Sequence, residues 1–163
     1  MKPSRCLPLL AALALAACAR TYETTYAPPP GLTAATGATV TGSKATDAAT
    51  GHLNRIVVAG IDAVPTEAMN SVFQEWDAVV LVPPGPHQVE LRSYLVKFPN
   101  QYLAAAVIPL DARAGEAYVI RGLPRATAAN GVLMVDLWAE TASGERASPV
   151  VGIPAYAPCD DTL

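Results

Sequence analysis

Short apolar runs, separated by proline, glycine and polar turn residues, fill the chain from residue 38 onward. The clearest run, residues 88–95, alternates between apolar and polar side chains with a period of two. One face carries Val89, Leu91, Ser93 and Leu95, and the other carries Gln88, Glu90, Arg92 and Tyr94. This period is that of a strand with one buried face, and no long helical period accompanies it. The pattern therefore predicts an all-β fold.

Similar runs recur along the chain with turn residues between them. The expected strands are residues 38–41, 53–61, 77–82, 88–95, 102–108, 117–122, 132–140 and 150–153. Seven or so strands at this spacing predict an antiparallel β-sandwich over residues 38–155. Residues 42–51 are small and polar and are expected to form a loop. Residues 67–73 are expected to form one helical turn.

Residues 83–86 read Pro-Pro-Gly-Pro and must turn the chain. The runs on either side of this turn predict a hairpin in which residues 77–82 pair with residues 88–95. The first of these strands is expected to be buried on both sides, and the second is expected to be half exposed.

The N-terminus has the layout of a secretory signal. Lys2 and Arg5 precede an apolar core, residues 7–17, that is interrupted only by Pro8. This core is too short for a transmembrane helix, which needs about 20 apolar residues. The core ends in Leu-Ala-Ala-Cys at residues 15–18, which resembles the lipobox of bacterial lipoproteins. The alternative is a plain cleaved signal followed by an incidental cysteine.

The lipobox implies that residues 1–17 are cleaved and that Cys18 is lipidated. Two or three acyl chains on Cys18 would anchor the chain to a membrane almost permanently, whereas one chain binds marginally. Ala19 follows where an aspartate would retain such a lipoprotein in the inner membrane. The resemblance therefore implies an outer-membrane lipoprotein that faces the periplasm.

Residues 18–37 are expected to form a proline-rich linker, because three consecutive prolines at 28–30 favour an extended, unpaired backbone. Residues 156–163 are expected to form a C-terminal tail. Cys159 in this tail is the only cysteine besides Cys6 and Cys18, so no disulfide framework is expected within the chain. The pattern leaves open whether Cys159 is free or paired with another molecule.

The net charge of the chain argues against nucleic acid as a partner. Lys2 and Arg5 leave with the signal, so nine basic residues face 14 acidic ones, a formal charge of −5. Nucleic acids and anionic headgroups need clustered lysine and arginine, which this chain does not show. We therefore expect no nucleic-acid partner.

Four short motifs resemble the PEGA-like and transthyretin-like periplasmic modules found in small, uncharacterised proteobacterial lipoproteins. They are residues 82–91, 41–44, 114–120 and 136–140 with 143–145. The resemblance spans roughly residues 38–154. It implies a β-sandwich with a binding or structural role in the envelope. Residues 92–98 also resemble a strand of type VI secretion lipoproteins, but here the proline-glycine element precedes that strand instead of following it.

No catalytic, cofactor or metal site is expected. His52 and His87 are the only histidines, and no spacing typical of zinc ligands is present. Ser93, His87 and Asp77 could be combined into a triad, but no nucleophile elbow or phosphate-binding loop marks an enzyme. A non-enzymatic role is therefore favoured, and a hydrolase with an unrecognised site stays as an alternative.

One candidate interaction face lies on residues 132–140. Asp136, Trp138 and Glu140 share a face of this expected strand. On an exposed sheet face, Trp138 and the further aromatics Trp76 and Tyr94 could stack a sugar or grip a partner strand beside these carboxylates. Asp136 and Glu140 are about 13 Å apart along a strand, too far for the paired carboxylates of a retaining glycosidase. The alternative is ordinary packing at a sheet edge.

Overall fold

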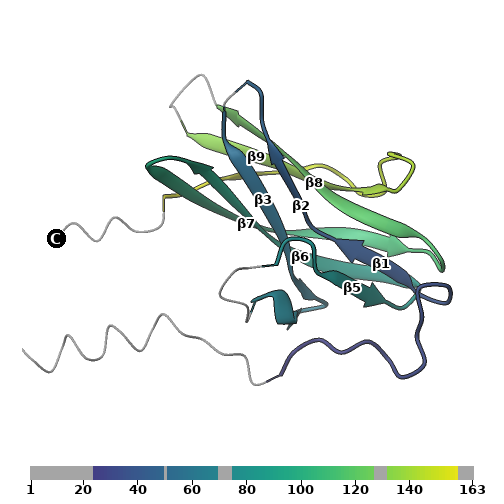
Figure 1. Cartoon of the computed structure of the whole chain (residues 1–163). Helices are drawn as coiled ribbons and strands as arrows, with labels where there is room; N and C mark the ends of the chain where they lie inside the picture. Colours follow the sequence, from purple (N-terminus) through teal and green to yellow (C-terminus); the bar gives the residue numbers. More distant parts are fainter. Residues whose placement is uncertain (1–23, 50, 70–74, 127–131, 158–163) are drawn as a thin grey trace, which may run out of the picture.

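The computed structural model describes residues 24–49, 51–69, 75–126 and 132–157. These residues form two five-stranded sheets that pack face to face, which confirms an all-β sandwich (Figure 1). The strands number ten, against the seven or so expected. No helix of the described residues is long and apolar enough to cross a membrane.

The first sheet has the strand order β10-β9-β8-β1-β5. Its strands are β1 (Ala38–Thr41), β5 (Val79–Val82), β8 (Ala117–Ala126), β9 (Leu133–Thr141) and β10 (Val151–Pro154). All neighbours are antiparallel except β1 and β8, which run parallel. The sandwich is therefore not purely antiparallel.

The second sheet has the order β2-β3-β6-β7, and β4 also pairs with β3. Its strands are β2 (Ser43–Thr46), β3 (Leu53–Ile61), β4 (Val64–Pro65), β6 (Gly85–Lys97) and β7 (Asn100–Ala112). A 3-10 turn, η1 (Glu67–Met69), follows β4. It coincides with the start of the helical turn expected at residues 67–73, of which 70–73 lie outside the described residues.

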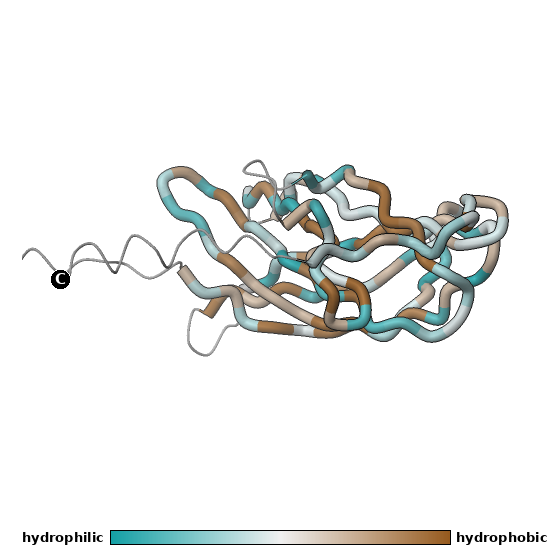
Figure 2. The backbone as a smooth tube through the Cα atoms, turned by 90° about the horizontal axis from the view of Figure 1, so that it is seen from below, coloured by the Kyte–Doolittle hydropathy of each residue, from teal (hydrophilic) through white to brown (hydrophobic). Residues whose placement is uncertain are grey.

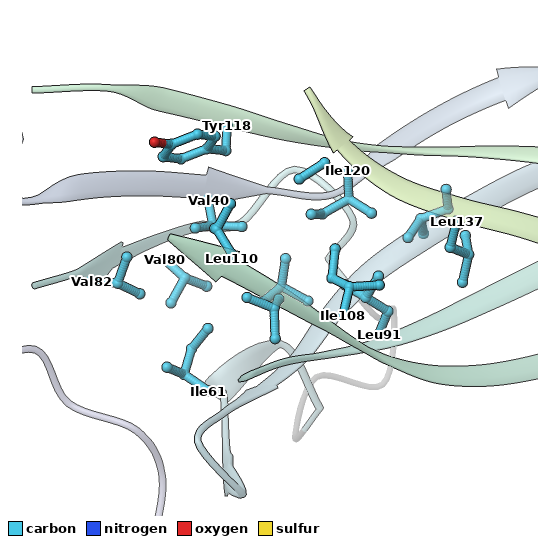
Figure 3. Close-up of a cluster of buried hydrophobic side chains, with 14 of the residues drawn as sticks. Val40, Ile61, Val80, Val82, Leu91, Ile108, Leu110, Tyr118, Ile120 and Leu137 are labelled. Atoms are coloured by element: carbon cyan, nitrogen blue, oxygen red, sulfur yellow. The ribbon is translucent and has the colours of Figure 1, made fainter. Parts of the chain in front are cut away.

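The core lies between the two sheets (Figure 3). The four residues of the expected inner face of residues 88–95 are all buried, as predicted. Tyr94, on the expected outer face, is buried as well, because it packs with Val57 and Ala68. In β9 the same alternation buries Val135, Leu137 and Ala139 completely. Hydrophobic (brown) and hydrophilic (teal) stretches follow one another along the backbone (Figure 2). In these strands, alternate residues therefore face the core, and the residues between them face outward.

The expected hairpin between residues 77–82 and 88–95 is wrong. β5 pairs with β1 in the first sheet, whereas β6 pairs with β3 and β7 in the second. Pro83 and Pro84 have no amide hydrogen for a strand ladder, so the chain leaves one sheet there and enters the other. β5 is an edge strand, and Val79 is 64% exposed, so β5 is not buried on both sides.

The loop expected at residues 42–51 contains strand β2. β1 and β2 are one extended run that changes sheets at Gly42. A side chain at Gly42 would collide with the backbone oxygen of Ile56, so the switch requires glycine. β2 escaped prediction because three of its four residues are exposed and carry no apolar pattern.

Two tyrosines close the open sides of the sandwich. On one side, the Tyr26 N–H donates to the Pro65 carbonyl at 2.7 Å, and its hydroxyl donates to the Leu81 carbonyl at 3.1 Å. On the other side, Tyr156 and Leu103 exchange backbone hydrogen bonds of 2.8 and 2.9 Å. Tyr26 thus bonds to both sheets, whereas the backbone of Tyr156 joins the chain after β10 to β7.

The described part of the expected linker contacts the sandwich through Tyr26. Residues 24–37 run beside the sandwich instead of forming an unattached spacer (Figure 1). Burial and the nearby charge of Asp62 raise the pKa of Tyr26, so its hydroxyl keeps the proton that it donates. The first part of the expected linker, residues 18–23, and most of the expected tail, including Cys159, lie outside the described residues.

The turn between β3 and β4 provides a test of local strain. Asp62 and Ala63 both have positive φ, 50° and 66°. Asp-Gly is the favoured pair for such a turn, because alanine pays a steric cost in this conformation. Ala63→Gly should raise the free energy of unfolding by about 1 kcal/mol in urea titrations. Ala45→Gly, at an exposed strand position with ordinary φ, should lower it. Equal effects of the two variants would contradict this account.

Candidate functional site

The residues of the predicted interaction face lie together on β9. Asp136, Trp138 and Glu140 all point away from the core, because the residues between them point into it. The face therefore forms on the outer side of the first sheet. The sequence predicted that these three side chains share one face of a strand, and in β9 they do.

Two arginines on β8 bind the carboxylates of this face. Arg121 Nε lies 3.1 Å from Glu140 Oε2, and Arg125 Nε lies 2.8 Å from Asp136 Oδ2. Both pairs are diagonal neighbours across the β8–β9 ladder, where such side chains are within reach of one another. About half of each arginine side chain remains exposed, so each pair contributes little to stability.

Trp138 is held on both its edge and its ring face. Its indole N–H donates to Glu140 Oε1 at 2.7 Å, and the Arg146 guanidinium lies 5.4 Å from the ring centroid. The indole hydrogen bond, followed by the interactions with Arg121, lowers the pKa of the Glu140 carboxyl. Glu140 therefore stays ionised and keeps the indole and the guanidinium in place.

The groups that this arrangement offers to a ligand are guanidinium N–H donors and an indole ring. The two guanidinium groups of β8 balance the two carboxylates of β9, and the Arg146 guanidinium over the indole adds one positive charge beside them. Leu123 lies between the two β8 arginines and is 48% exposed. Exposed guanidinium groups beside an indole suit hydroxyl, carboxylate or phosphate groups on a ligand. We name Arg121, Arg125, Trp138, Asp136 and Glu140 the β8–β9 face.

The sequence contained a signal for the arginines of the β8–β9 face that was not used. Arg121 and Arg125 are spaced by four residues, as are Asp136 and Glu140. Antiparallel strands run in opposite directions, so the first arginine of one strand meets the second carboxylate of the other. The equal spacing then brings Arg125 to Asp136 when Arg121 meets Glu140. Recognising this required knowing that 117–126 and 133–141 are neighbours.

His87 lies in a second polar cluster, at the start of β6. Its Nδ1 is 2.7 Å from Asp62 Oδ2, and its Nε2 is 2.9 Å from the Pro83 carbonyl oxygen. Both partners are acceptors, so both contacts are hydrogen bonds only when the ring carries two protons. Asp62 Oδ1 also accepts the Gln88 N–H at 2.8 Å. The cluster clamps the β3–β4 turn to the start of β6.

The triad that could be written from the sequence is not assembled. Ser93 is fully buried between the sheets, where its hydroxyl donates to Asn54 Oδ1 at 2.7 Å. His87 bonds to Asp62 and Pro83 instead of Ser93 or Asp77. Within the described part of the chain, no three His, Cys, Asp or Glu residues gather as metal ligands.

A shallow groove of about 270 Å³ lies on the outer side of the second sheet. Its lining includes Ala59, Met69, Glu90, Arg92, Ala105 and Val107. None of the residues singled out from the sequence as a site lines it. Its walls are partly polar and partly apolar, and they include one carboxylate and one guanidinium.

Comparisons with known proteins return no match: no family model, no curated protein and no solved structure is similar to this chain. The resemblance to periplasmic lipoprotein modules therefore stays a prediction from the sequence.

The clamp around Asp62 makes a prediction about pH. Its hydrogen bond from Gln88, followed by the contact with His87, holds the pKa of Asp62 below its usual range. A carboxyl with a lowered pKa stabilises the fold above its unfolded-state pKa of about 4, and this stability is lost as the pH falls through the folded-state pKa. Asp62→Asn should therefore cost about 1 kcal/mol at pH 7, a small value because the side chain is half exposed.

Urea unfolding of the wild type and Asp62→Asn, measured at pH 7 and again near pH 2, tests this. The two proteins should converge at the lower pH. A difference that stays constant over this range would show that the charge of Asp62 is not what stabilises the clamp.

Proposed function

We propose that the mature chain is a lipid-anchored lipoprotein on the periplasmic face of the outer membrane, where its sandwich has a non-catalytic binding or structural role. The observation that carries this proposal is the Leu-Ala-Ala-Cys sequence at residues 15–18, placed directly behind a short apolar core with two basic residues ahead of it. Ala19 supports transfer to the outer membrane.

The β8–β9 face supports the binding form of this role. Trp138 and the exposed parts of Arg121 and Arg125 offer an aromatic surface with hydrogen-bond donors on a rigid sheet. Rigid aromatic and arginine side chains are the residue types that most often dominate binding energies at interfaces. The partner class that fits is an envelope protein strand or a glycan that carries acidic or hydroxyl groups.

Lipidation is tested by replacing the cysteine that would carry the acyl chains. Cys18→Ser should abolish acylation, detected by mass spectrometry of the mature N-terminus, and should move the protein out of the outer-membrane fraction of a sucrose gradient. Cys6→Ser is the matched control, because that residue would leave with the signal, and it should change neither readout. Unchanged membrane fractionation of Cys18→Ser would refute the anchor.

Binding by the β8–β9 face is tested with the purified protein against solubilised envelope proteins and isolated envelope glycans. Arg121→Gln and Trp138→Ala should each weaken capture by about tenfold or more, as removal of a central interface residue does. Val107→Ala, half exposed on the other sheet, is the control and should bind normally. Equal capture by all three variants, or no specific ligand for the wild type, would contradict a binding role for this face.

A further inference from the structure

The segment ahead of β1 is hydrogen-bonded to the sandwich at two residues: Tyr26, and Gly37 directly before β1, whose carbonyl accepts the Gly115 N–H at 2.6 Å. Tyr26 makes the hydrogen bonds that join residues 24–36 to the rest of the domain, one to the Pro65 carbonyl on β4 and one to the Leu81 carbonyl on β5. Its ring also packs against the main core cluster. We call residues 24–37 the strap and Tyr26 its hook.

Between the hook and Gly37, the strap is mostly exposed. Of residues 27–36, only Leu32 is half-buried, and the others are exposed. The hydrogen bonds of Thr33 and Thr36 stay within the strap, where they close a local turn. Between Tyr26 and Gly37, the strap therefore has few contacts that hold it in place.

A segment with few buried contacts opens at a lower free energy than the whole domain. Opening of the strap would leave the pairing of β1 with β5 and β8 intact, since these bonds begin at Ala38 and Thr39. It would expose the edges of β4 and β5 that the hook bridges, but none of the fully buried core residues belongs to the strap. The strap can thus detach without unfolding the sandwich.

We propose that Tyr26 is a releasable hook that sets how far the sandwich can stand from the membrane. The reach part of this inference rests on the proposed lipidation of Cys18. With the hook in place, eight residue steps separate Cys18 from Tyr26, which span at most about 26–29 Å. With the hook released, 19 steps separate Cys18 from Gly37, which span at most about 63–68 Å. The same chain thus has a short and a long tether.

The chemistry of the hook suits reversible attachment. A phenol that donates to a backbone carbonyl, together with one backbone hydrogen bond, can exchange both partners for water at modest cost. The contact does not depend on pH near neutrality, because burial and Asp62 keep the phenol protonated. Tyr26→Phe keeps the ring and the backbone bond, so it should weaken the hook without removing it.

The hook itself is tested by hydrogen exchange on the full mature chain. The backbone N–H of Tyr26 should exchange slowly in the wild type, and Tyr26→Ala should speed exchange of residues 26–37 by about tenfold. Thr24→Ala, an exposed position in the same strap, is the matched control and should leave exchange unchanged. Equal exchange in the wild type and Tyr26→Ala would overturn the hook, whatever the state of Cys18.

The reach is tested with lipidated protein in vesicles of phosphatidylethanolamine and phosphatidylglycerol. A dye on Ser143→Cys, in a Cys159→Ser background, reports energy transfer to a labelled lipid. Tyr26→Ala should lower the transfer efficiency, and Tyr26→Phe should give an intermediate value. The same efficiency in all variants would overturn control of reach by Tyr26. Failure of every variant to bind vesicles would instead refute the lipid anchor, while the exchange experiment still reports on the hook.

Discussion

The burial of two apolar sheet faces against each other is the constraint on which the rest of this structure depends. The long strands of both sheets contribute their inward-facing residues to that interface, and the largest of them, among them Ile56, Leu91 and Leu137, are almost fully buried. Polar side chains enter only with partners: Asn54 accepts from Ser93 within its own sheet and donates to the Gly122 carbonyl of the other at 3.3 Å. The sheets are further linked where the chain crosses from one to the other at Gly42. The hydrogen bonds of Tyr26 add a second link between their edges.

The sequence predicts the strands well where they contribute to this interface. Residues 38–41 and 53–61 were expected as strands and form β1 and β3 with the same limits. Pairing was harder to predict, because a proline-glycine turn shows that the chain reverses but not whether it stays in its sheet. β2 carries no apolar alternation because most of it is exposed. The docking of Tyr26 depends on two carbonyl groups that are 39 and 55 positions away in the chain, and no local pattern records them.

For the candidate site, too, the sequence predicts local placement but not the partners from other strands. A period of two was enough to place Asp136, Trp138 and Glu140 on one face, since that follows from strand geometry alone. Their arginine partners depend on which strand lies beside β9 and in which register, and both follow from the whole fold. The clamp of His87 and Asp62 joins residues 25 positions apart that meet only because β3 and β6 are neighbours. Local chemistry was therefore readable from the sequence, whereas partnerships between strands were not.

The parallel pairing of β1 with β8 has a mechanical consequence. A pull on the chain ahead of Ala38 acts along the axis of β1, which is bonded to β5 on one side and to β8 on the other. Such a pull loads all of these hydrogen bonds together, in shear, instead of opening them one after another. Force arriving through an N-terminal anchor would thus meet the strand best placed to resist it, and it would pass directly to β8, which carries two arginines of the β8–β9 face.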